Sequence, residues 1–257
     1  MILTLAIREV RSLFLSPLAW TILAVVQFIL GFIFLSRVEL FIKSQSQLVG
    51  LDSAYGITDI IVSPLFGNIL TIIVLLLVIP LLTMRLLSEE LRSQTISLLF
   101  SAPISMTEIV LGKYLGIMIF LAIMLGMIAI MPLSLLIGGS LDYGMFLSCL
   151  MAMILFLGVF AAVGLFMSSL TNQPIIAAIS AFAVLLMLLI IGSTTSVPDT
   201  GQDINISSLF AYLSLHGHFV SLLQGVFSSY DIAYFLLLII TFLVLTIRRM
   251  DAYRLQH

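Results

Sequence analysis

The pair Gly112-Lys113 is a first candidate for chemistry, because it resembles the end of a phosphate-binding loop. Such a loop needs an early glycine and, directly after the lysine, a serine or threonine whose hydroxyl binds magnesium. Position 107 is a threonine where the glycine should stand, and Tyr114 follows the lysine. The pattern fails at both positions, so the sequence predicts that this chain does not bind and hydrolyse ATP itself.

A second candidate is the histidine pair His216 and His218. Two ligands at i and i+2 are too few for a zinc site, and the sequence offers no identifiable third ligand. The long apolar stretches contain serines but no histidine, which argues against an intramembrane serine protease. We therefore interpret these histidines as polar residues of an outer segment, and expect neither a catalytic residue nor a metal.

A third candidate is the charged stretch at 85–105, which carries Arg85, Glu89, Glu90 and Arg92. Ser88 could cap a short helix in which charged and apolar residues lie on different faces. Two interpretations remain open on the residues alone. The stretch is either a helix that docks a partner, or a solvated charged loop that only maintains topology.

The next element begins with a clear signal. Pro103 should end the short helix, and Ser105 and Glu108 have the spacing of a capping box, which predicts that a new helix starts there.

The elements that position these residues must lie in a bilayer. The chain has 257 residues, is 62% hydrophobic, has a mean hydropathy of +1.30 and is only 9% charged, against about 25% in ordinary soluble domains. A helix needs about 20 apolar residues to cross the hydrocarbon. Six stretches qualify: 17–36, 65–84, 109–137, 145–170, 173–195 and 231–247. The sequence predicts a single-domain, all-α polytopic membrane protein spanning residues 1–257.

The distribution of lysine and arginine predicts the orientation. If both termini are cytoplasmic, the inner segments hold eight basic residues and the outer segments hold two. This is a strong positive-inside bias. The inner set is Arg8, Arg11, Arg85, Arg92, Lys113, Arg248, Arg249 and Arg254. The net charge of −2 gives no reason to expect a nucleic-acid partner.

Residues 1–16 are predicted to form an amphipathic helix in the inner headgroup layer. Leu3 and Ile7 share one face, and Arg8 and Arg11 share another. The alternative is an extension of the first span, but Pro17 favours a break.

Other segments are read from their composition. Residues 196–230 are expected to form two short outer helices that dip into the membrane, and residues 248–257 a cytoplasmic tail. We expect Asn68 and Thr71, which are polar residues within a span, to make helix–helix hydrogen bonds.

Several motifs occur together in one order. They are the N-terminal Arg8, Glu9, Phe14, Ser16 and Pro17, the run Pro80-Leu-Leu-Thr-Met-Arg85, Glu89-Glu90, Ala102-Pro103-Ile104-Ser105, Gly112-Lys113, and His218 with Asp231 near the end. In this order they resemble the ABC-2 type exporter permeases, with the gliding-motility and copper-enzyme-maturation branch closest. The sequence departs from that pattern at Gln94, where glycine is usual, and at Ser97, where glutamate is common.

The resemblance implies roles for the predicted pieces. The architecture would be that of a type V exporter-like permease, with residues 1–16 as an interface helix and 85–105 as a coupling helix in a cleft of the ATPase. Arg85, Glu89, Glu90 and Arg92 would couple to the ATPase, while Arg8 and Arg11 would hold the interface helix at anionic headgroups. His216 and His218 would belong to the outer re-entrant segment.

The resemblance also implies partners and a location. We expect ABC ATPase subunits that bind ATP and magnesium, a second permease copy, the lipid bilayer and a periplasmic accessory protein, with no cofactor on this chain. The expected location is a bacterial inner membrane.

Three functions are compared with the sequence. The first is the permease subunit of an ATP-driven exporter, whose route would form between two copies. The alternative is a non-transporting subunit that uses the same ATPase dock as a scaffold or to transmit force to envelope partners. A lipid-modifying enzyme is disfavoured, because neither membrane interface carries a charged or histidine cluster. The substrate does not follow from the sequence.

Overall fold

Long apolar helices make up most of the chain. The structure is a computed structural model, and it describes residues 1–48, 58–94, 105–137, 142–193, 214–226 and 228–256. These residues are almost entirely helical and contain no strand. Six of the helical segments are long and apolar enough to cross a membrane, as the composition predicts. They are Pro17–Lys43, Thr58–Arg92, Met106–Leu136, Tyr143–Leu170, Pro174–Ile191 and Ser229–Arg254.

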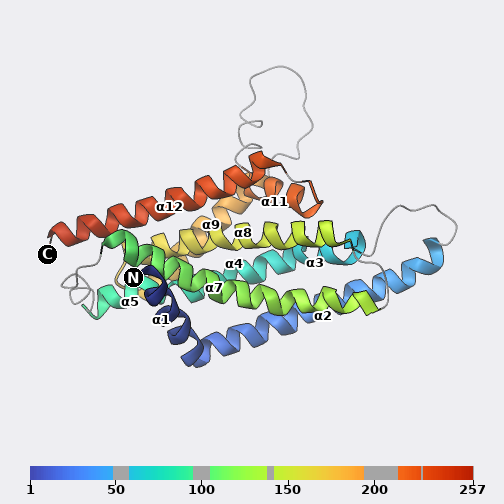
Figure 1. The fold of residues 1–257 in the computed structure, drawn as a ribbon, viewed down its shortest axis with the longest axis horizontal. Coiled ribbons are helices and arrows are strands. Elements are labelled where there is room, and N and C mark those ends of the chain that lie inside the picture. Colours follow the sequence, from blue (N-terminus) through green and yellow to red (C-terminus); the bar gives the residue numbers. More distant parts are fainter. Residues whose placement is uncertain (49–57, 95–104, 138–141, 194–213, 227, 257) are drawn as a thin grey trace, which may run out of the picture.

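The elements follow one another in a simple order (Figure 1). They are α1 (Ile2–Leu15), α2 (Pro17–Leu48), a π-helical turn (Thr58–Val62), α3 (Ser63–Gly67), α4 (Ile69–Thr83), α5 (Arg85–Arg92), α7 (Met106–Leu133), a 3₁₀ turn (Ser134–Ile137), α8 (Tyr143–Leu170), α9 (Pro174–Ser193), α11 (Leu215–Leu223) and α12 (Ser229–Gln256).

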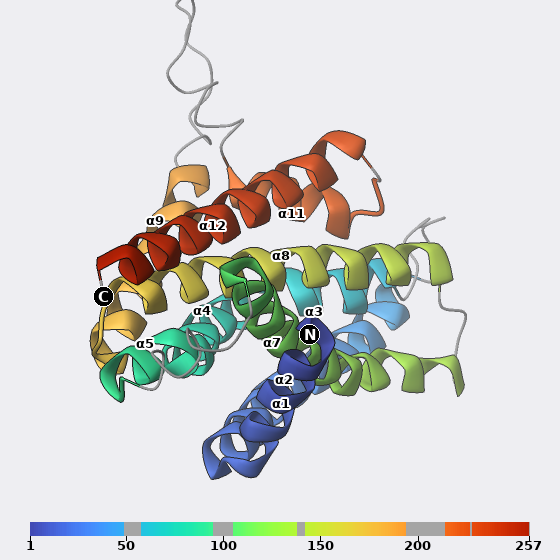
Figure 2. The same cartoon turned by 60° about the vertical axis from the view of Figure 1, so that its left-hand side comes forward.

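Helix α8 lies in the middle of the bundle. It runs between α7 and α12 in both views (Figures 1 and 2), and it packs against α4, α5, α9 and α11 as well. Of its membrane-spanning window, 72% is buried, against 17% for α9 and 22% for α12. Its aromatic residues Phe156 and Phe160 are fully buried and pack on each other, with ring centroids 4.3 Å apart. The other spans therefore surround α8 and present more of their surface to the lipid.

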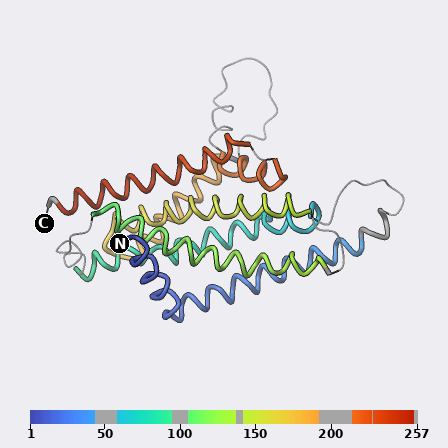
Figure 3. The backbone as a smooth tube through the Cα atoms, in the orientation of Figure 1, coloured from blue at the N-terminus to red at the C-terminus, as the bar shows by residue number. Residues whose placement is uncertain are grey.

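Helix α1 is separate from the first span. Ser16 has an extended conformation (φ −81°, ψ 129°) and ends α1, and Pro17 begins α2. Proline is favoured at the first position of a helix because it has no N–H to leave unpaired. Figure 3 shows the sharp change of chain direction at this point. Residues 1–16 are thus not an extension of the first span.

The second membrane-crossing segment is interrupted. Asn68 is extended between α3 and α4, its Oδ1 accepts a hydrogen bond from the Leu70 N–H at 3.1 Å, and the Thr71 hydroxyl donates to the Leu65 carbonyl at 2.8 Å. The prediction that Asn68 and Thr71 bond to other spans is wrong. Both side chains instead satisfy backbone groups that the break would leave unpaired in an apolar environment.

Several helices extend beyond the ranges read from hydropathy. Helix α2 continues past residue 36 to Leu48, where Glu39 and Lys43 form an i,i+4 ion pair at 2.6 Å. Helix α12 continues past residue 247 to Gln256, so most of the segment taken as a tail is helical. Charged residues can extend a helix into water, although they end an apolar stretch.

Helices α4 and α8 pack closely at a glycine. A Cβ added to Gly164 would lie 2.1 Å from Thr83 Oγ1 and 2.8 Å from Thr83 Cβ, and Thr83 is fully buried. Small residues allow helix backbones to approach closely in a membrane, where packing is the main attractive force between helices.

This packing predicts a difference between two glycines. Gly164→Ala should destabilise the protein by about 1–3 kcal/mol, because overpacking forces neighbouring side chains and backbone to shift. Gly126→Ala on α7 is the matched control, since a Cβ there meets nothing within 4 Å. Thermal unfolding of the purified variants in detergent measures the difference. Equal midpoints for both variants would contradict the assigned packing.

Candidate functional site

Helix α5 is short and amphipathic. Leu86, Leu87 and Leu91 are buried, whereas Arg85, Glu89 and Arg92 are exposed. The described helix ends at Arg92, and residues 95–104 of the predicted coupling region lie outside the described part of the chain. A helix with this division of faces packs one side on the bundle and leaves the charged side available to a partner.

The start of α5 is capped by a residue from another helix. The Ser168 hydroxyl of α8 accepts hydrogen bonds from the backbone N–H groups of Leu87 (3.1 Å) and Ser88 (3.0 Å), and donates to the Met84 carbonyl (2.9 Å). The first N–H groups of a helix lack partners within the helix, so this contact replaces a local cap. It fixes the first turn of α5 to α8.

The prediction that Ser88 caps this helix is wrong. Met84 keeps helical angles (φ −55°, ψ −32°), so α5 already begins at Arg85 and Ser88 lies within it. The Ser88 hydroxyl donates to the Met84 carbonyl one turn earlier. The predicted capping box at the next helix is confirmed: Ser105 Oγ accepts from the Glu108 N–H at 3.3 Å, and Glu108 Oε2 accepts from the Ser105 N–H at 3.2 Å.

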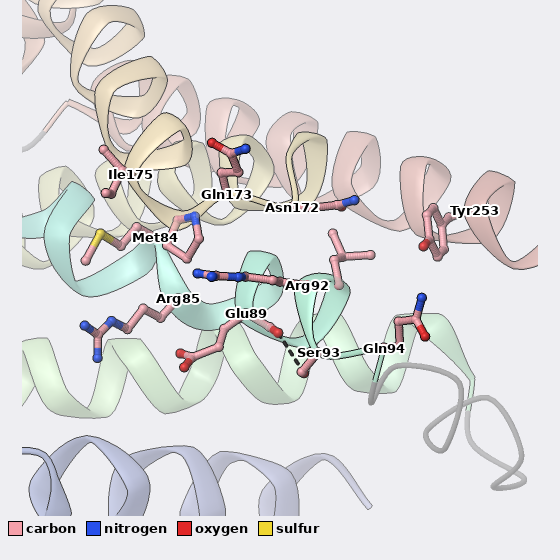
Figure 4. Close-up of a pocket in the computed structure, with 12 residues that line it drawn as sticks. Met84, Arg85, Glu89, Arg92, Ser93, Gln94, Asn172, Gln173, Ile175 and Tyr253 are labelled. Atoms are coloured by element: carbon pink, nitrogen blue, oxygen red, sulfur yellow. Dashed lines mark hydrogen bonds between the residues drawn. The ribbon is translucent and has the colours of Figure 1, made fainter.

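A polar groove opens beside the exposed face of α5. Its volume is about 1040 Å³, and it is bounded by α5, by the turn between α8 and α9, and by the end of α12. Figure 4 shows Arg85, Glu89 and Arg92 on one side, Asn172 and Gln173 on the turn opposite, and Tyr253 on α12. The complete lining is Met84, Arg85, Glu89, Leu91, Arg92, Ser93, Gln94, Asn172, Gln173, Pro174, Ile175 and Tyr253.

Glu90 differs from its neighbour Glu89, because it points into the protein. Its Oε1 lies 2.7 Å from the ammonium of Lys113 on α7, which also contacts Glu9 Oε1 of α1 at 2.6 Å. The Lys113 side chain is 4% exposed, and those of Glu9 and Glu90 are 13% and 19% exposed. Arg8 approaches the same Glu90 oxygen at 3.7 Å from a more exposed position. This buried ion cluster, formed by Glu9, Glu90, Lys113 and Arg8, joins three helices.

The approach of α1 to α7 brings these charges together. A Cβ on Gly112 would lie 2.7 Å from Leu5 Cβ and 3.2 Å from the Ile2 carbonyl oxygen. A Cβ on Gly116 would lie 2.7 Å from Glu9 Cβ and 3.2 Å from the Ala6 carbonyl oxygen. The two glycines are one helical turn apart and form the small-xxx-small pattern that allows backbone contact. Gly112 thus serves helix packing.

The remaining faces of α1 point outward. Leu3 and Ile7 are 70% and 56% exposed, and Arg8 and Arg11 are exposed as well. Further along, Phe14 packs on Phe120 of α7, with ring centroids 5.3 Å apart. This distribution suits a helix with one face on the bundle, an apolar face on lipid and basic residues near headgroups.

The two predicted outer histidines have different surroundings. His218 is buried on α11, and its Nδ1 lies 2.6 Å from Oδ1 of the buried Asp231 on α12. His216 is partly exposed. Sequence reasoning missed Asp231 as a partner, although both residues belong to one motif of the resemblance. Within the described residues, no group of three His, Cys, Asp or Glu side chains could hold a metal.

Helix α11 is also held by α8. The Ser148 hydroxyl donates to the Leu222 carbonyl at 2.6 Å, and the Cys149 thiol donates to the Leu223 carbonyl at 3.4 Å. These carbonyls belong to the last turn of α11, where the regular i+4 hydrogen bonds of a helix end; the Leu222 carbonyl also accepts from the Gly225 N–H at 3.2 Å. Helix α11, the described part of the segment predicted to be outer, is therefore attached to both α8 and α12.

The fold and this site define a class of protein: a polytopic α-helical membrane protein with a charged, amphipathic helix exposed at one end of its bundle. The family model described as "ABC-2 family transporter protein" matches residues 3–254. The chain belongs to this family of transporter membrane proteins. No curated protein matches the chain.

The cap from α8 gives a test of how α5 is held. Ser168→Ala should weaken the first turn of α5 by about 0.5–2 kcal/mol, the usual cost of losing a helix cap. Amide hydrogen exchange at Leu87 and Ser88 should speed up accordingly. Ser169→Ala is the control, because within the described residues the Ser169 hydroxyl bonds only to the Phe166 carbonyl of its own helix (2.6 Å). Exchange that is unchanged in Ser168→Ala would show that α5 does not depend on this cap.

Proposed function

We propose that this chain is the permease subunit of an ATP-binding-cassette exporter, driven by separate ATPase subunits that dock on α5. The observation that carries the proposal is the amphipathic character of α5, with three buried leucines and an exposed Arg85, Glu89 and Arg92 beside a polar groove. The family membership supports it. ATP and magnesium would be bound by the ATPase partner.

We place α5 on the cytoplasmic side of a bacterial inner membrane, with both termini on that side. The start of α1 and the end of α12 lie at the same end of the bundle as α5 (Figure 1). That end carries most of the basic residues, including Arg8, Arg11, Arg248 and Arg249. The positive-inside bias supports this orientation.

We further propose that two copies pair and that the transported molecule passes between them. The centre of the described bundle is occupied by α8, and its aromatic residues Phe156 and Phe160 are fully buried. A packed centre favours a route at the surface of the bundle over a route through a single chain. The gliding-motility and copper-enzyme-maturation branch remains our proposal for the closest relatives.

The site residues divide into two groups in this proposal. Arg85, Glu89 and Arg92 have exposed side chains and would contact the ATPase. The carboxylate of Glu90 already binds Lys113, so we assign Glu90 to the interior of the permease. Arg8 and Arg11 would keep their role near lipid headgroups.

The docking assignment is tested by reversing charge on the exposed face. In Glu89→Lys with Arg92→Glu, affinity for the ATPase should fall at least about tenfold, because like charges brought together at an interface cost several kcal/mol. Co-purification with the ATPase and stimulated ATP hydrolysis measure the loss, and membrane insertion should stay normal.

Glu39→Lys on α2 is the control, since Glu39 is also exposed and α2 runs away from α5 to the opposite end of the bundle (Figure 1). It should leave ATPase binding unchanged. An ATPase that stays bound and stimulated by the double variant would show that α5 is not the dock.

A further inference from the structure

We propose that Lys113 is a positioning residue that makes α1, α5 and α7 move as one unit, so that a displacement of α5 carries the membrane-surface helix α1 with it. The inference rests on the proposed function, in which the ATPase acts on α5. In this inference the buried ion cluster transmits the displacement of α5 to α1, which faces the lipid.

The first step is the rigid contact of α1 with α7. At Gly112 and Gly116 the two backbones are close enough that even a methyl group would lie 2.7 Å from a side-chain carbon of α1. Ala6, between the contact points, is 1% exposed. Contacts without intervening long side chains leave little freedom to slide, because interiors are close-packed. Helix α1 should therefore follow α7.

The second step is the link from α5 to this pair. Helix α5 packs on α8, α4 and α9. In the part of the chain that the structure describes, the ion pairs that join α5 to α1 and α7 all involve Glu90. Its partners are Lys113 and, more weakly at 3.7 Å, Arg8. The ionic connection between α5 and the pair α1–α7 thus depends on the single carboxylate of Glu90.

The third step is the strength of that connection. Two cations and two carboxylates balance in the cluster, so its net charge is zero. Lys113 is 3% exposed, and separating a buried ion from its partners would leave an uncompensated charge in a medium of low polarity. Glu90 Oε2 is buried and has no hydrogen-bond partner among the described residues, so Oε1 makes the contacts that hold this carboxylate. Displacing α5 alone would break these contacts, whereas moving the three helices together keeps them.

The consequence concerns the membrane surface. Helix α1 exposes Leu3 and Ile7 and is joined to α2 through the single residue Ser16. A displacement carried by α1 would act directly on the start of the first span and on the lipid around it. Glu90 and Glu89 would then have separate tasks, since one transmits motion and the other receives the ATPase.

The test measures the position of α1 in the intact complex. Spin labels at Ser12→Cys on α1 and Arg249→Cys on α12, both exposed positions outside the cluster, report their separation in lipid nanodiscs with the ATPase bound. The natural Cys149 is buried and is replaced by alanine in all labelled proteins. Distances are compared without nucleotide and with ATP and vanadate.

Two variants separate the link from the dock. Glu90→Leu removes both ion pairs of α5 and leaves Lys113 paired with Glu9, so no buried cation is left unpaired. The fourfold variant Arg8→Glu, Glu9→Lys, Glu90→Lys and Lys113→Glu inverts all four charges, so that each ion pair can form again with opposite polarity. We expect the nucleotide-dependent shift in the unsubstituted protein, its loss in Glu90→Leu with the ATPase still bound, and its return in the charge inversion.

Three results would overturn the inference. They are a shift that persists in Glu90→Leu, a loss that the charge inversion does not reverse, and an unsubstituted complex that binds the ATPase but shows no movement of α1. The last result leaves the proposed function intact. Failure of the unsubstituted chain to bind any ATPase would instead reject the proposed function, and this inference with it.

Discussion

The contact between α1 and α7 is the constraint on which the arrangement of α1, α5 and α7 depends. Because Gly112 and Gly116 bring the two backbones together, Glu9 must lie over α7 beside Lys113. An ammonium held in that position is screened from water and needs carboxylates around it. Glu90 supplies the second one and draws α5 against the pair. The close packing at these two glycines therefore determines which charged side chains meet.

Helix α8 holds a short helix at each end of the bundle. At one end Ser168 caps the first turn of α5, and at the other Ser148 and Cys149 bond to the last carbonyls of α11. Both partners are short helices, whose unpaired terminal groups are a large fraction of their backbone. In an apolar surrounding such groups must be satisfied by protein. A mostly buried central helix with small polar side chains near its ends meets this need.

The sequence predicted what depends on composition and local spacing. Apolar length defined six spans, Pro17 marked the break after α1, and Ser105 with Glu108 marked the start of α7. The errors concern backbone groups. Ser88 and Asn68 were assigned by residue type, but their roles follow from where each helix begins. Ser168, which caps α5, lies about 80 positions away in the sequence, and no local sequence pattern predicts such a contact.

Glu89 and Glu90 are adjacent on α5, yet their surroundings differ. The presence of charged residues in a segment therefore does not predict which of them are exposed to a partner. Adjacent residues on a helix point about 100° apart, since a turn contains 3.6 residues. On a helix that is half buried, this rotation places Glu89 in the groove and Glu90 on Lys113. The lysine itself was visible as the one charge within the third span, and a charge in that position needs a partner. That requirement points to a nearby carboxylate. Glu90 meets it, because the amphipathic helix α5 turns this side chain inward. A helix of eight residues can in this way leave one charge exposed and bury the next one against the helices on which it packs.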